Sequence, residues 1–232
     1  MQWSLRVVRI DFQLQDLARR PLLPPFGAEI HHRSETLVGL TDPWLGLRLS
    51  GAPLGLEAAV RLGATLPLGA TVENPFRLGR AGEAHQHTQF GTGTVDPFAE
   101  ALLQRRAGRF IVGGWLLGKA SLYANRHGYQ AGALLTGGVR ASSDLWLPRW
   151  QFQLGALCYH EEPERWSGVI ETEGNLGRTD LMLETSVLWR FAPAWTVSLG
   201  ARVPVWSRIT GAQLSTPAIA DLSFSRLLRL GR

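Results

Sequence analysis

The sequence has little of several residue types that often reveal what a protein does. Cys158 is the only cysteine, so the chain must fold without an internal disulfide. Lys119 is the only lysine, and although the formal net charge is +5, the arginines are scattered along the chain without a local run. Binding of nucleic acid normally needs a concentrated basic patch, so we expect no nucleic-acid partner.

Long apolar runs and enzyme motifs are absent as well. No stretch of about eighteen apolar residues exists, which excludes a transmembrane helix. The sequence contains no GxSxG, HExxH or CxxC motif and no phosphate-binding glycine loop followed by a helix, so we predict that the chain is not an enzyme. The one enzymatic alternative is a rim-located hydrolase that uses His160 as a base, with Glu161 beside it.

What the sequence does have is apolar alternation with a period of two. It is clearest over residues 56–66, 181–191 and 195–205. This period predicts β-strands with two different faces, and strands of about a dozen residues exceed the usual length of about 5–6. We therefore predict an all-β chain that forms a single domain over residues 1–232, with ten strands near 2–12, 34–50, 54–67, 92–105, 108–122, 129–142, 148–160, 178–191, 194–206 and 215–228.

The connections between these strands alternate in length. Residues 51–53, 106–107, 142–147 and 192–193 are short connections, whereas 13–33, 68–91, 161–177 and 207–214 are long and 123–128 is intermediate. Alternation of this kind is typical of an antiparallel transmembrane β-barrel with short periplasmic turns and long outer loops. We predict a barrel of about ten strands in a bacterial outer membrane, or twelve if an N-terminal hairpin precedes residue 1. No charged-then-apolar secretion signal precedes the first strand.

A barrel of this kind implies particular partners and an aromatic girdle. The expected partners are the lipid bilayer, lipopolysaccharide and the barrel-assembly machinery.

Tryptophan is abundant, with 9 residues against 3 tyrosines. Aromatic rings gather where strands cross the lipid headgroups. Five tryptophans lie next to the predicted periplasmic turns and form the predicted girdle: Trp3, Trp146, Trp150, Trp189 and Trp195.

Charged residues on the other face of the strands are expected to line the lumen. These residues are Arg6, Arg48, Glu57, Arg61, Glu100, Lys119, Arg140, Asp180, Glu184, Arg190, Arg202 and Asp221. An unpaired buried charge costs several kcal/mol, so we expect these groups to pair across the interior. Two outcomes remain open: a hydrogen-bonded plug, or a narrow polar pore whose arginines mildly favour anions.

A short motif occurs twice. Thr41-Asp42-Pro43-Trp44 is echoed by Val95-Asp96-Pro97-Phe98, each within a predicted strand that follows a long loop. Proline removes a ladder donor, so each Asp-Pro predicts a bulge or bend that shapes the barrel.

Three further motifs resemble a known family. The segment GTGTVDP at 91–97, LGATLPLG at 62–69 and ARVPV at 201–205 resemble motifs in outer-membrane transporters of the meta-pathway of phenol degradation type. The likeness covers roughly residues 34–228. It implies a closed barrel and passage of small apolar compounds. The sequence departs from the usual barrel ending, because Phe224 is followed by eight more residues where the family has a terminal aromatic residue.

The histidines suggest an alternative function. All six lie in the predicted outer loops or at their edges. His85 and His87 point to the same side of an extended segment, which suits copper, nickel or zinc, and His31 and His32 on the preceding loop could complete a site. The sequence thus predicts a transporter or channel for small molecules without a cofactor. The alternatives are a surface barrel that binds or senses copper or zinc through these histidines, and a sealed structural barrel.

Overall fold

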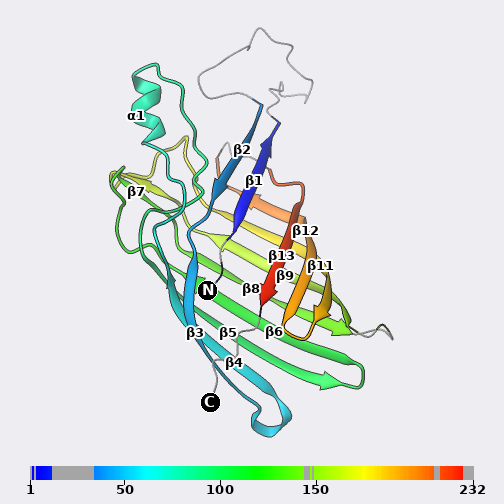
Figure 1. Cartoon of the computed structure of the whole chain (residues 1–232). Helices are drawn as coiled ribbons and strands as arrows, with labels where there is room; N and C mark the ends of the chain where they lie inside the picture. The colour runs from blue at the N-terminus through cyan, green and yellow to red at the C-terminus, as the bar shows by residue number, and fades with distance from the viewer. Residues whose placement is uncertain are drawn as a thin grey trace.

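The computed structural model describes residue 2 and residues 4–11, 34–143, 147, 149–211 and 215–226. Its main feature is one curled antiparallel sheet, a half-barrel of nine strands in the order β13-β12-β11-β9-β8-β6-β5-β4-β3 (Figure 1). The prediction of an all-β chain is confirmed. The strands are β3 (Trp44–Gly51), β4 (Glu57–Thr65), β5 (Asp96–Ala107), β6 (Phe110–Lys119), β8 (Leu134–Ser143), β9 (Trp150–Glu161), β11 (Arg178–Ala192), β12 (Trp195–Ile209) and β13 (Ile219–Arg226).

A two-stranded sheet continues the large one beyond β3. β1 (Leu5–Ile10) pairs antiparallel with β2 (Glu35–Leu40), and only residues 41–43 separate β2 from β3. Gln2 and Trp44 exchange two backbone hydrogen bonds of 2.9 and 2.7 Å, which attach the start of the chain to β3. With β2 and β3 counted as one broken strand, the described strands match the ten predicted segments.

Connections of the two lengths lie at opposite ends of the sheet. The short connections that follow β3, β5, β8 and β11 lie at one end, and the long loops lie at the other end, with α1 (Figure 1). Some predicted turns are wrong in their bounds: Arg106 and Ala107 belong to β5, so Gly108 and Arg109 form that turn, and Ala192 belongs to β11. Gly108 has a φ of 62°, which glycine adopts without steric cost, so the chain reverses there.

The long loops carry three short elements, which we call the loop cap. They are α1 (Pro75–Arg80), β7 (Tyr129–Gln130) and β10 (Arg165–Trp166), and β7 pairs with β10. Asn74 begins the helix by accepting hydrogen bonds from the amides of Phe76 and Arg77. Phe76, Tyr129 and Trp166 form the buried core of the cap. A six-residue helix is too short to show a helical period, so it was missed in the sequence.

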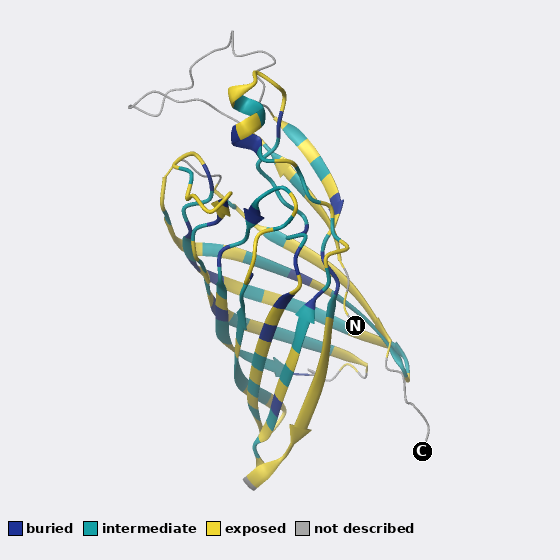
Figure 2. Ribbon diagram, turned by 90° about the vertical axis from the view of Figure 1, so that its left-hand side faces the viewer, coloured by how far each residue is buried: buried dark blue, intermediate teal, exposed yellow. Residues whose placement is uncertain are grey.

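The two faces of the sheet differ as the alternation predicts (Figure 2). Along β5, exposed residues alternate with half-buried or buried ones, whereas the edge strands β3 and β13 are exposed at every residue but the first. The convex, outer face presents large apolar side chains, among which Leu47 is 82% exposed and Leu199 is 60% exposed. No helix among the described residues is long and apolar enough to span a membrane.

Candidate functional site: the inner face and its mouth

The inner face of the sheet collects the charged side chains. Cross-strand partners face the same side, so the register places ten of the twelve predicted lumen residues on this face. They are Arg48, Glu57, Arg61, Glu100, Lys119, Arg140, Asp180, Glu184, Arg202 and Asp221. Arg6 lies on β1, opposite Gly39 of β2. Arg190 lies beyond a register irregularity at the end of β11, so the alternation does not fix its face.

The inner-face charges pair along the wall of the sheet. Arg61 Nε lies 2.7 Å from Glu100 Oε2 on the next strand, and Arg202 Nη2 lies 3.4 Å from Asp221 Oδ1 on the next strand. Arg178 holds Asp180 on its own strand through Nε and Nη2, at 2.7 and 3.2 Å. The expectation that these charges pair across the interior is therefore wrong for these pairs. Neighbouring strands bring opposite charges close enough that no side chain has to reach across.

Some inner-face charges have no ionic partner among the described residues. Neither Arg48 nor Arg140 forms an ion pair or a hydrogen bond there. Glu184 lies two strands from Arg140, with Gly155 between them in the register. A Cβ on Gly155 would lie 2.7 Å from Glu184 Oε1, so the glycine leaves the space that this carboxylate occupies. Arg140 and Glu184 therefore place a positive and a negative charge on the inner face two strands apart, with a glycine between them.

Glycines also make room for a large ring on the inner face. A Cβ at Gly46 or Gly63 would lie within 3 Å of Phe98 Cζ, at 2.9 and 2.8 Å. Phe98 is buried, and the Arg61 guanidinium lies over its ring at 5.1 Å. The interior is thus partly filled at this level by side chains that lie flat on the wall.

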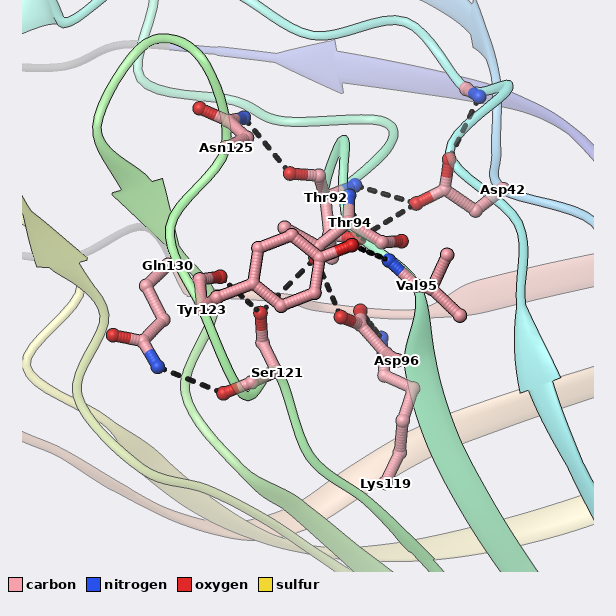
Figure 3. A network of polar contacts seen from close by, with 11 residues as sticks. Asp42, Thr92, Thr94, Val95, Asp96, Lys119, Ser121, Tyr123, Asn125 and Gln130 are labelled. Atoms are coloured by element: carbon pink, nitrogen blue, oxygen red, sulfur yellow. Dashed lines mark hydrogen bonds and ion pairs between the residues drawn. The ribbon is translucent and has the colours of Figure 1, made fainter.

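At the mouth, next to the long loops, a polar network joins segments far apart in the sequence (Figure 3). The Asp42 carboxylate accepts hydrogen bonds from the Gly69 amide at 2.8 Å and the Thr92 amide at 2.6 Å. It also accepts one from the Thr92 hydroxyl at 2.8 Å. Asn125 donates to the Thr92 carbonyl at 2.9 Å. The break between β2 and β3 is therefore fixed by one buried carboxylate to both ends of the loop between β4 and β5.

The second Asp-Pro motif extends this network onto the inner face of the sheet. Asp96 is fully buried and accepts a hydrogen bond from the Thr94 hydroxyl at 2.6 Å, while Lys119 Nζ lies 3.5 Å from its other oxygen. The Thr94 and Ser121 hydroxyls lie 3.1 Å apart, and the Tyr123 hydroxyl accepts from the Val95 amide at 2.8 Å (Figure 3). The first Asp-Pro lies at the predicted bend, but the second opens β5 and bends no strand. In the sequence, only the repeated Asp-Pro motif indicated the two carboxylates, Asp42 and Asp96, that accept these hydrogen bonds.

The loop cap contains a buried carboxyl group. Glu164 Oε1 accepts hydrogen bonds from Trp166 Nε1 at 3.0 Å and from the Asn175 amide at 3.2 Å. Burial raises the pKa of Glu164, and the hydrogen bonds from Trp166 and Asn175 oppose that rise. Burial, together with the charge of Glu164, also raises the pKa of Tyr129.

The predicted metal ligands fall into two groups. His31 and His32 lie outside the described residues. The rings of His85 and His87 lie 5.2 Å apart, and His85 Nδ1 is 2.9 Å from the Glu83 carbonyl oxygen. Within the described ranges, no group of three or more His, Cys, Asp or Glu side chains is placed to hold a metal ion.

The residues of the enzymatic alternative are not brought together. His160 Nδ1 lies 2.8 Å from the Thr179 hydroxyl, on the outer face at the long-loop end. Glu161 is the next residue of the same strand and therefore faces the inner side, where it accepts a hydrogen bond from Tyr159.

An aromatic cluster lies at the short-turn end. Trp150 and Trp189 stack with ring centroids 5.5 Å apart, and Trp195 lies 4.9 Å from Phe224. Phe191 joins the two pairs, at 5.6 Å from Trp189 and 5.9 Å from Phe224. Three of the five tryptophans of the predicted girdle thus lie in one cluster, and Trp3 and Trp146 lie outside the described residues.

Comparison with known proteins does not add to this picture. No family model and no curated protein matches the sequence.

Proposed function

We propose that the chain is a closed transmembrane β-barrel of a bacterial outer membrane that conducts small molecules. The observation that carries this proposal is the distribution of charge between the two faces. On β11 the outward residues from Thr179 to Trp189 are uncharged, whereas the inward face of the same strand carries Asp180 and Glu184. A soluble half-barrel would expose this apolar face to water, whereas lipid would stabilise it.

The height of the apolar face suits a bilayer. Eleven residues from Thr179 to Trp189 rise about 33 Å at roughly 3.3 Å per residue, and a tilt of about 40° reduces this to roughly 25 Å. That height is typical of the apolar band of outer-membrane barrels. The aromatic cluster lies at one end of this band, as a headgroup girdle would.

Closure of the barrel joins β1 to β13. β1 runs toward the long loops, and β13 runs away from them, so the two edges are antiparallel as an up-and-down barrel requires. Lipid would not tolerate two open edges, because their amides and carbonyls would have no partners.

Pairs of introduced cysteines test this closure. In a Cys158→Ser background, one cysteine on β1 and one on β13 should form a disulfide on oxidation when both face the same side. Val7→Cys with Leu222→Cys, at two exposed positions, is a starting pair. Val7→Cys with Leu47→Cys is the matched control and should not crosslink, because Val7 pairs with Val38, far from Leu47 along the same edge. Failure of every same-face β1–β13 pair to crosslink would refute closure between these strands.

The lumen is proposed to be a narrow polar pore that favours anions slightly. The observed ion pairs join neighbouring strands along the wall and do not cross the interior, which favours a pore over a plug of paired charges. Arg48 and Arg140 add positive charge without an ionic partner among the described residues. The resemblance to outer-membrane transporters of phenol degradation is part of this proposal, with small apolar compounds as the candidate substrates.

Two measurements test the function. Protein refolded in detergent should migrate differently on a gel before and after boiling, as closed barrels do. Planar bilayers containing it should then conduct, with a reversal potential in a salt gradient that favours chloride. An Arg140→Glu variant should shift this potential toward cations, and Arg126→Glu in the outer loops should not. A folded, gel-shifting protein without conductance would show a sealed barrel and refute the pore.

A further inference from the structure

The short-turn end of the sheet gathers arginines that are far apart in the sequence. Five exposed arginines lie in the short turns or at the strand ends beside them: Arg105, Arg106, Arg149, Arg190 and Arg226. We call this set the arginine rim. The amide of Arg190 donates to the Arg149 carbonyl at 2.7 Å, so two separate turns meet within the rim. Strand pairing thus brings Arg149, Arg190 and Arg226 to the same end of the sheet as the neighbouring Arg105 and Arg106.

The described residues of the same region contain no carboxylate. The described residues in 51–56, 104–112, 141–152, 188–197 and 223–226 include no aspartate or glutamate. Asp144, the acidic residue of the 144–149 turn, lies outside the described residues. The nearest acidic strand residue in the described part is Glu57, whose carboxylate accepts a hydrogen bond of 2.6 Å from Gln104. Among the described residues, the rim therefore carries a strong positive charge with no carboxylate of these ranges beside it.

The opposite end of the sheet has a different balance. Glutamates in the outer loops offset the arginines there: Arg77 pairs with Glu73 at 2.8 Å and Arg80 lies 3.9 Å from Glu171. Among the described residues, the long-loop end thus has acidic partners for its arginines that the short-turn end lacks.

The rim lies directly beside the aromatic cluster, in the order that membrane interfaces favour. Arg105 follows the outward Leu103 on β5. The guanidinium of Arg226 lies over the Trp195 ring at 4.9 Å. Apolar residues, aromatic rings and arginines thus succeed one another toward the short turns. Aromatic rings lie at headgroup depth, and arginines next to them lie at the depth of lipid phosphates.

We propose that the arginine rim binds the phosphates of anionic phospholipids, phosphatidylglycerol in particular, in the leaflet that faces the short turns. This inference rests on the proposed function, because it requires the sheet to span a bilayer. Guanidinium groups bind phosphate oxygens in pairs of parallel hydrogen bonds. The rim would attract a headgroup with a net negative charge and would discriminate against the zwitterionic phosphatidylcholine.

The test measures lipid preference at the protein surface. The refolded chain is inserted into vesicles that contain phosphatidylcholine and phosphatidylglycerol, with brominated chains on one lipid at a time. Quenching of tryptophan fluorescence then gives the ratio of the two association constants. Attraction of an anionic lipid to one arginine is worth about fivefold in binding. Averaged over all lipid contacts, we expect the association constant of phosphatidylglycerol to exceed that of phosphatidylcholine about twofold or more at low salt. In roughly 0.5 M salt the ratio should fall toward one, because salt screens the attraction.

Three variants make the test specific. The triple variant Arg105→Gln, Arg106→Gln, Arg149→Gln should lose the preference, and the same three changes to Lys should keep most of it. The control variant Arg77→Gln, Arg80→Gln, Arg126→Gln removes the same charge from the outer loops and should keep the preference. A ratio of one in the unaltered protein, or equal ratios in the rim and control variants, would overturn the inference.

The same samples are also run unheated on a gel. A folded band with no lipid preference would refute the arginine rim as a phosphate site and leave the membrane barrel standing. Absence of a folded, inserted band would refute the proposed barrel and this inference with it.

Discussion

Substitution of an outward leucine can measure whether lipid or water surrounds the sheet. Leu183 lies midway along β11, faces outward and is 51% exposed. In lipid, arginine at mid-depth costs about 2–4 kcal/mol. Loss of contact between lipid and the exposed half of the leucine accounts for about 1 kcal/mol of that cost. In water, the same exposed substitution would change the free energy of unfolding by at most about 0.5 kcal/mol.

The experiment compares Leu183→Arg with Leu68→Arg, since Leu68 is 60% exposed but lies in a long loop. Both proteins are refolded into vesicles and unfolded with guanidinium, and the folded fraction is followed by gel migration. We expect the folding equilibrium of Leu183→Arg to fall roughly 30- to 700-fold relative to Leu68→Arg. Equal stabilities within about 0.5 kcal/mol would show that water, not lipid, lies outside β11.

Three other predictions concern the mouth, the cap and the wall. Asp42→Ala should lower the free energy of unfolding by about 2–4 kcal/mol, because its carboxylate accepts three hydrogen bonds, and Asp42→Asn should cost less; chemical unfolding checks both. Burial raises the pKa of Glu164, so the stability that the protonated carboxyl gives the cap is fully present below the ordinary pKa of glutamate and is lost as the pH rises through the raised pKa. Hydrogen exchange of residues 164–175 should therefore become faster over that pH range, and Glu164→Gln should abolish this pH dependence. Gly63→Ala should destabilise the β3–β4 pair by more than about 2 kcal/mol, because its Cβ would lie 2.0 Å from a backbone oxygen, whereas Gly51→Ala, with its nearest neighbour at 4.0 Å, should be tolerated in the same unfolding assay.

The sequence predicted the features that follow from local periodicity. Alternation with a period of two assigns each strand residue to one of two faces, and the strands keep regular ladders over most of their lengths. That is why the alternation puts residues such as Glu100 and Asp180 on the same face of the sheet as the strand register does. Arg190 is the exception, because a register irregularity separates it from the alternating part of β11.

Features that depend on contacts between distant segments could not be predicted in this way. Asp42 binds groups 27 and 50 residues away, and nothing in its immediate sequence indicates those partners. The arginines looked scattered because a chain that crosses the sheet back and forth returns to the short-turn end only once every two strands. Arg105, Arg149 and Arg226 are far apart in sequence, and the topology places them in one rim.

The mouth network also connects the loops to the inner face of the sheet. The carboxylate of Asp42 binds Thr92, and the Thr92 hydroxyl lies 3.4 Å from the Thr94 backbone groups. Thr94 donates to Asp96, which lies beside Lys119 on the inner face. These contacts form a continuous path from the break between β2 and β3 to a charge inside the sheet. A change at Asp42 would therefore alter the position of Lys119 as well as the loops, so access to the interior and the charge that lines it are not independent in this fold.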